Sequence, residues 1–397
     1  MRTASLSAVV LALVAASAAT ASEGRFTFRP VSVSFVPGFS TNGSEWKSVS
    51  SSFSLNVIGG SIGRVQGVEL GSVFNIDEVD ALGFQAAGVF NTVGTRFEGA
   101  QMAGVFNVVG QDALGFQAAG VFNIVGSGFE GAQLAGVFNI VGEYAPGFEA
   151  AGVFNIVGES FFGAQAAGVA NVAGRGGDGV QAAGVLNIAG EQLSGLQLSC
   201  GVNVADEFSG AQVGLVNIAG TGRGLQVGLV NIAGDVDVPI GLVSIVEQGM
   251  FHVNAWATEF APVNVGIKTG SNSIYNVFMV GWRPNGDSTR VFGGIGIGGH
   301  IPVDRFFVDV DLLSHGVFTG PDWFSDGGSD LLSSLRLTGG WQVTEKLAVT
   351  AGPTLNVWVS DREDGSRVPF YDLPLYEWRG SEYVRVWPGF AAGLQSP

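Results

Sequence analysis

The sequence predicts an all-β protein, and three observations lead to that class. The middle of the chain repeats with a fixed step and combines glycine with β-branched and aromatic residues, which favour strands over helices. Charged residues are largely confined to the connectors between the repeated blocks. From Phe251 onward the repeat gives way to alternation of apolar and polar residues, which is typical of strands with two unlike faces.

The composition excludes several classes of protein. The chain has 397 residues and 63 glycines, and only 13% of its residues are charged, against an ordinary share of about 25%. The net charge of −16 leaves no basic surface for phosphates, so we expect no nucleic-acid partner. The single cysteine excludes a disulfide framework and a cysteine-based metal site.

The first residues read as a targeting signal. Arg2 supplies a short basic end, Leu6 to Ala16 form an apolar run, and Ala19-Thr20-Ala21 is a small-x-small cleavage site. We therefore predict a signal peptide over residues 1–21 and an exported protein. A segment of N-terminal strands is expected over residues 22–66.

Residues 67–248 are predicted to form tandem β repeats of 14 to 16 residues. The repeat is marked by asparagines spaced 16 apart, at Asn91, Asn107, Asn123, Asn139, Asn155, Asn171, Asn187 and Asn203. Six residues before the asparagine stands a glutamine, which Glu149 replaces once. Three residues before it stands a glycine, which Cys200 replaces once. Shorter copies follow around Asn217 and Asn231.

Two architectures agree with this repeat. A block of about ten residues, read as one tilted strand, spans roughly 25 Å, the apolar height of an outer-membrane barrel. A soluble solenoid would carry polar outward side chains, and these blocks have almost none. The favoured prediction is thus a large antiparallel transmembrane β-barrel built partly from 16-residue repeats. In that barrel, the phenylalanines face lipid and the asparagine and glutamine amides face inward.

The alternative is a β-solenoid repeat region followed by a C-terminal β-barrel. In the short copies, Gln212 and Asn217 are five residues apart instead of six, and so are Gln226 and Asn231. A change of one residue reverses the faces of a continuous strand, whereas a solenoid corner near Gly214 absorbs it. The solenoid predicts parallel pairing of each asparagine with the next one, and the barrel predicts antiparallel neighbours.

Residues 249–397 are predicted to form barrel-like strands with loops. Val263, Val265 and Ile267, for example, alternate with Asn264, Gly266 and Lys268. On this pattern we expect five charged residues to line the interior of the barrel, namely Lys268, Asp309, Asp311, Arg336 and Arg385.

The sequence contains no motif that predicts catalysis. The run from Gly294 to Gly299 resembles a dinucleotide-binding loop only superficially, because Pro302 follows where a helix is required. His252, His300 and His315 do not have the spacing of metal ligands. We therefore expect no enzyme activity, no cofactor and no metal site.

Several segments together resemble a family of bacterial surface-repeat proteins. They are Phe35-Val-Pro-Gly-Phe-Ser-Thr-Asn-Gly43, Ser54-Leu-Asn-Val-Ile58, the tandem QxAGVFNIVG blocks and Tyr275-Asn-Val-Phe278. The resemblance covers nearly the whole mature chain and implies an exported protein of the outer surface of Gram-negative-type bacteria, with no biochemical activity attached. The chain departs from usual barrel proteins in ending Gly393-Leu-Gln-Ser-Pro397 instead of on an aromatic residue.

The expected function is that of an outer-membrane or cell-surface β-repeat protein with a scaffold or passive-pore role, in contact with outer-membrane lipid. The alternative function is that of a surface-displayed solenoid that acts as an adhesin or binding protein. The sequence does not identify a surface ligand.

Overall fold

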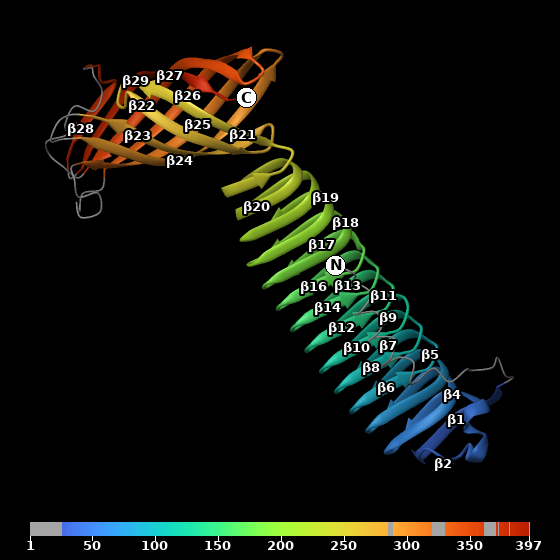
Figure 1. Cartoon of the computed structure of the whole chain (residues 1–397). Helices are drawn as coiled ribbons and strands as arrows, with labels where there is room; N and C mark the ends of the chain where they lie inside the picture. Colours follow the sequence, from blue (N-terminus) through green and yellow to red (C-terminus); the bar gives the residue numbers. More distant parts are fainter. Residues whose placement is uncertain are drawn as a thin grey trace. The chain divides into compact units, whose positions relative to one another are not determined.

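The computed structural model describes residues 26–284, 289–319, 330–360, 371, 373–380 and 382–396. The predicted signal peptide, residues 1–21, lies outside the described residues. The chain divides into two compact units, residues 1–219 and residues 220–397 (Figure 1). Both units are built from strands, so the all-β prediction is confirmed. No helix in the described ranges has the length and apolarity to cross a membrane.

The first unit is a parallel β-solenoid. Each strand of the repeats pairs in parallel with the strand one coil later, and the register places Asn123 beside Asn139 and Gln117 beside Gln133. The repeats therefore adopt the alternative architecture, and the expectation that they form antiparallel transmembrane strands is corrected. The barrel is restricted to the C-terminal region. The repeated block is not one strand, because a tight corner divides it into a long and a short strand.

The elements of the solenoid fall into four groups. The N-terminal elements are β1 (Thr27–Val36), β2 (Phe39–Ser40), the 3₁₀ helix η2 (Gly43–Ser48), β3 (Val49–Asn56), β4 (Gly59–Gly71) and β5 (Phe74–Ala87). The long strands are β7 (Arg96–Ala103), β9 (Asp112–Ala119), β11 (Phe129–Ala135), β13 (Tyr144–Ala151), β15 (Ser160–Ala167) and β17 (Gly176–Ala183). The short strands are β6 (Phe90–Val93), β8 (Phe106–Val109), β10 (Phe122–Val125), β12 (Phe138–Val141), β14 (Phe154–Val157) and β16 (Ala170–Ala173). The last strands are β18 (Leu186–Ser199), β19 (Val202–Val213) and β20 (Val216–Val246).

One glycine in each long strand is required by the close stacking of coils. Gly115 in β9 has a φ of +118°, and a Cβ built on it would lie 2.1 Å from the backbone oxygen of Gly99 in the preceding coil. L-residues rarely adopt this φ, and no side chain fits the space. The same position carries a glycine with positive φ in coil after coil, which accounts for part of the high glycine content.

The interior of the solenoid combines apolar side chains with amides. Every asparagine of the repeat ladder has a relative exposure of 0%. Asn123 Nδ2 donates to Asn139 Oδ1 at 2.9 Å and to the backbone oxygen of Leu134 at 2.9 Å. A second ladder runs through the glutamines, where Gln133 Nε2 donates to Gln117 Oε1 at 2.7 Å. Both polar rows are thus buried and hydrogen-bonded between coils.

The second unit contains a closed antiparallel barrel of eight strands, because β21 pairs with both β22 and β29. The elements are β21 (Met250–Thr258), β22 (Val263–Gly270), β23 (Ile274–Arg283), β24 (Arg290–Val303), β25 (Phe306–Thr319), β26 (Leu331–Thr344), β27 (Leu347–Ser360) and β29 (Tyr383–Gln395). A short strand, β28 (Tyr376–Arg379), pairs with β29 alone.

The two ends of the barrel differ. Turns of two or three residues join β22 to β23, β24 to β25 and β26 to β27 at one end, and the other connections are longer. Strand β20 crosses the boundary between the two units, and its residues from Gly220 onward belong to the second unit. Two of these residues contact the short-turn end of the barrel. Thr269 Oγ1 donates to the backbone oxygen of Ser244 at 2.9 Å, and Ser271 Oγ donates to that of Asp237 at 2.9 Å. The chain therefore enters the barrel at its short-turn end.

Candidate functional site

The five charged residues expected in the barrel interior are all buried. Their relative exposures are 2% for Lys268, 1% for Asp309, 0% for Asp311, 5% for Arg336 and 5% for Arg385. They lie on four strands, and the alternation along each strand points them to the inner face. Charged groups this deeply buried need partners of opposite charge.

Asp309 is the centre of one cluster. Lys268 Nζ lies 2.5 Å from Asp309 Oδ2 and donates also to Gln395 Oε1 at 3.2 Å. The other oxygen of Asp309 lies 2.6 Å from His300 Nδ1. The Lys268 ammonium also lies 4.6 Å from the centre of the Tyr275 ring. The carboxylate thus meets one fixed cation and one imidazole.

Asp311 is the centre of a second cluster. Arg336 Nε donates to Asp311 Oδ2 at 2.8 Å, and the Tyr275 hydroxyl donates to Asp311 Oδ1 at 2.6 Å. The Arg336 guanidinium lies 4.7 Å from the centre of the Trp256 ring. Tyr275 is shared, since its ring contacts Lys268 and its hydroxyl contacts Asp311.

A third buried carboxylate, Glu259, was not singled out from the sequence. It accepts hydrogen bonds from Trp387 Nε1 at 2.8 Å, from Asn356 Nδ2 at 2.7 Å and from the backbone N–H of Phe390 at 3.0 Å. In the sequence, the only indication of a role for Glu259 is that it is a lone acid in an apolar stretch between two strands. His300 and Tyr275 were also missed as partners, because their proximity to the aspartates depends on strand register.

The barrel interior is filled at these levels. A cavity lined by Lys268, Arg336 and Trp256 among others measures about 10 Å³, roughly the space of one water molecule. Near Glu259, bulky side chains pack into one cluster that includes Phe260, Phe292, Trp358 and Trp387. The arrangement can hold charges in place inside the barrel.

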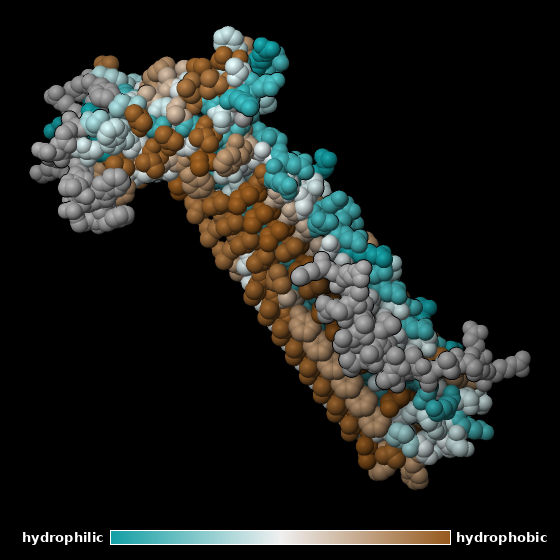
Figure 2. Space-filling view, in the orientation of Figure 1, coloured by the Kyte–Doolittle hydropathy of each residue, from teal (hydrophilic) through white to brown (hydrophobic). Residues whose placement is uncertain are grey.

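The solenoid carries an apolar side and a polar side. Figure 2 shows hydrophobic residues along one side of the coils and hydrophilic residues along the opposite side. On the apolar side, six phenylalanines form a continuous stack with ring centroids 4.9 to 5.1 Å apart: Phe74, Phe90, Phe106, Phe122, Phe138 and Phe154. These rings are half-buried on the outer face of the short strands. The apolar exterior expected from the sequence is therefore present on a solenoid.

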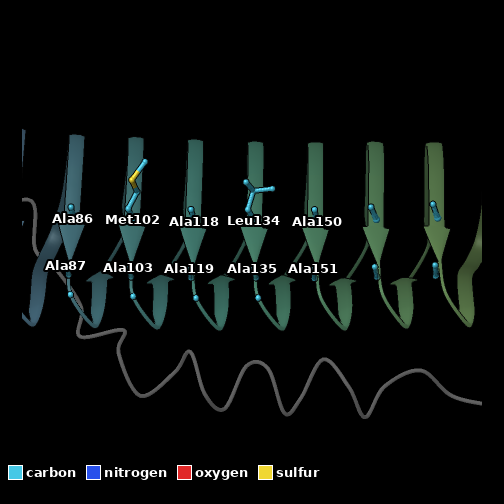
Figure 3. A pocket seen from close by; sticks show the side chains of 18 of the residues that line it. Ala86, Ala87, Met102, Ala103, Ala118, Ala119, Leu134, Ala135, Ala150 and Ala151 are labelled. Carbon is cyan, nitrogen blue, oxygen red and sulfur yellow. The ribbon is translucent and has the colours of Figure 1, made fainter.

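A groove follows the corner between the long and short strands. It has a volume of about 1430 Å³ and runs from Leu55 to Val213, lined mostly by alanine, glycine and leucine. Figure 3 shows its side chains as two rows that recur from strand to strand, such as Ala118 above Ala119. The backbone at the corner forms hydrogen bonds to the preceding coil; for example, the Gly120 N–H donates to the backbone oxygen of Ala103 at 3.2 Å.

Other candidate features remain isolated. Cys200 is exposed and forms no disulfide. Within the described part of the chain, no group of three or more His, Cys, Asp or Glu is placed to hold a metal ion. Two acids, Glu69 and Asp77, are buried in the solenoid, and Gln85 Nε2 donates to both. Burial, followed by the neighbouring charge of Glu69, raises the pKa of Asp77 well above its usual range.

Comparison with known proteins adds no relative. No family model, no curated protein and no solved structure matches the chain.

Proposed function

We propose that the protein is an outer-membrane scaffold whose C-terminal barrel is a closed anchor, which the chain enters at its short-turn end. The observation that carries this proposal is the inverted polarity of the barrel. Its outward side chains are large and apolar, with relative exposures of 58% at Leu312 and 47% at Leu335, while acids and bases are buried inside. A barrel in water has the opposite distribution, and one in lipid has this one.

The packed interior favours an anchor over a passive pore. The two aspartate clusters and their partners occupy the lumen, and the cavity between Lys268 and Arg336 holds roughly one water. Trp282 and Trp341 are about half exposed on the outer surface. Such rings are enriched where a barrel meets the lipid headgroups. Membership of the surface-repeat family stays a prediction that agrees with this role.

Retention in the membrane tests the proposal. The full-length protein, produced in a Gram-negative host, is expected to remain in the membrane pellet after a carbonate wash. It is also expected to migrate differently on gels before and after heating, because a closed barrel resists detergent until it is heated. Release into the wash together with unchanged migration would contradict a membrane anchor.

A pair of matched variants sharpens this test. Leu335→Arg places a charge on the outward face near the middle of β26, and we expect it to cost about 2–4 kcal/mol and to reduce the heat-modifiable fraction. Leu373→Arg makes the same change at an exposed position in the long connection after β27, where we expect little effect. Equal effects at the two positions would argue for a barrel surrounded by water.

A further inference from the structure

The glutamine ladder contains one rung that is an acid. From Gln85 to Gln133, each amide donates to the rung before it, as in Gln117 Nε2 to Gln101 Oε1 at 2.7 Å and Gln133 Nε2 to Gln117 Oε1 at 2.7 Å. The next rung is Glu149, in register with Gln133. Glu149 accepts from Gln165 Nε2 at 2.6 Å through Oε2, but a carboxylate has no proton to give to Gln133.

The missing hydrogen bond affects both residues, Gln133 and Glu149. Gln133 Oε1 and Glu149 Oε1 are both buried without a hydrogen-bond partner among the described residues. Reversing the amides from Gln85 to Gln133 would supply the missing donor. It would also remove the bond of 2.8 Å that Gln85 gives to the buried carboxylate of Glu69. The orientation of the ladder therefore leaves one place where two acceptor oxygens lack a hydrogen between them.

Among the described residues, the strands packed against Glu149 carry no positive charge. Its own strand β13 carries Tyr144, and the adjacent β11 carries Glu130; both side chains are exposed. The other strands packed against it, β12, β14 and β15, have no titratable residue. Burial raises the pKa of Glu149 to about 8, and the hydrogen bond from Gln165 lowers it only in part.

We propose that Glu149 is a pH-sensitive rung of the solenoid: its carboxyl group carries a proton that it donates to Gln133 Oε1, and loss of this proton loosens the coils on either side. In the neutral form the ladder is complete from Gln85 to Gln197 and beyond. In the ionised form a buried charge faces an amide oxygen, and the coil must open to hydrate it.

The sign of the pH effect follows from linkage. The folded state raises the pKa of Glu149 from its ordinary value of 4.5 to about 8, so folding binds the proton more tightly. The stabilisation is complete below about pH 4.5 and is lost as the pH rises toward 8. Over that window the constant for opening this coil should rise tenfold per pH unit, and above it the constant should level off.

Hydrogen exchange of the full-length protein in detergent tests the proposal, with wild type and Glu149→Gln compared at each pH so that intrinsic exchange rates cancel. We expect peptides that cover residues 129–171 to lose protection with rising pH in wild type and to keep it in Glu149→Gln. Peptides from residues 186–213 serve as an internal reference and should not follow this trend. Glu130→Gln, an exposed acid one coil earlier, should behave as wild type.

Three results would overturn the proposal. The first is equal pH dependence in residues 129–171 and in the reference peptides of wild type, which needs no variant and stands even where Glu149→Gln does not fold. The second is protection that changes on exchanging sodium for potassium but not with pH, since this would place a cation between the two oxygens. The third is an infrared difference spectrum between wild type and Glu149→Gln at neutral pH that contains a carboxylate band and no protonated-carboxyl band.

Discussion

Lys268 and Arg336 each meet a buried aspartate inside the barrel, and this pairing decides what single substitutions do there. A pair such as Lys268 and Asp309 contributes little net stability, because desolvation of both charges offsets their attraction. Removing one partner is different, since the remaining charge stays buried and uncompensated. The His300 ring beside Asp309 at 2.6 Å compensates that charge only when it is protonated.

Lys268→Met is therefore expected to destabilise the barrel by roughly 3–5 kcal/mol. Urea unfolding of the protein refolded into detergent micelles would measure the loss. Lys346→Met removes an exposed lysine at the turn between β26 and β27 and should change stability little. The double variant Lys268→Met/Asp309→Asn should regain part of the loss, because a neutral amide needs no counter-charge. Equal stability of Lys268→Met and wild type would show that the pair is not buried.

At the scale of the element, the alternation between successive repeats reflects packing inside the solenoid. One inward position of the long strand carries Ala81, Phe97, Ala113 and Phe129 in consecutive coils, in register with one another. All four are buried. Each ring is flanked by alanines in register with it, so large and small inward side chains alternate from coil to coil. The packing pattern of these coils therefore repeats every two coils, or 32 residues.

Phe129→Ala should leave a cavity and cost about 3–5 kcal/mol of local stability. The matched control is Phe122→Ala, which removes a half-buried ring from the outer stack; we expect a loss of roughly 1–2 kcal/mol there. Since solenoid coils need not unfold together, exchange protection of the flanking coils is a better measure than a global midpoint. A larger effect at Phe122 than at Phe129 would contradict the inward and outward assignment.

At the scale of the whole molecule, the difference between the two ends of the barrel predicts on which side of the outer membrane the chain enters it. Bacterial outer-membrane barrels place their short turns toward the periplasm and their long loops outside. The chain enters this barrel at the short-turn end, where Ser271 contacts the backbone of Asp237. The usual orientation would put the segment by which the chain enters the barrel in the periplasm, whereas an adhesin requires its binding region outside.

The single cysteine of the chain separates these two locations. Cys200 is exposed on the solenoid, so a membrane-impermeant thiol reagent should label it only after the outer membrane has been permeabilised. The control is Leu373→Cys in a Cys200→Ser background, which places the thiol at an exposed site in a long barrel connection and should react in intact cells. Labelling of Cys200 in intact cells would favour the surface-displayed binding protein.

Much of the candidate site could be predicted from the sequence, because the inward and outward positions of a strand follow from the alternation of its side chains. That pattern predicts Lys268, Asp309, Asp311, Arg336 and Arg385 as lumen residues, and the side chains of all five are buried. Their partners were not predictable, since pairs such as His300 with Asp309 exist only once the register between β24 and β25 is known. Glu149 was noticed as an exception in a glutamine series, but its missing donor appears only when the coils are stacked.

The sequence by itself determined the strand content, the 16-residue period, the apolar exterior of the repeats and the alternation of the C-terminal strands, because each of these is a local property of side-chain order. Only the tertiary structure decided the direction of pairing. An apolar block with buried amides is compatible with both an antiparallel barrel and a parallel coil. The sequence of one strand does not indicate whether the neighbouring strand runs parallel or antiparallel to it. The five-residue spacing of Gln212 and Asn217 was the one local feature of the sequence that indicated a solenoid. The two residues lie on different strands, β19 and β20, with a corner between them at Gly214 and Leu215.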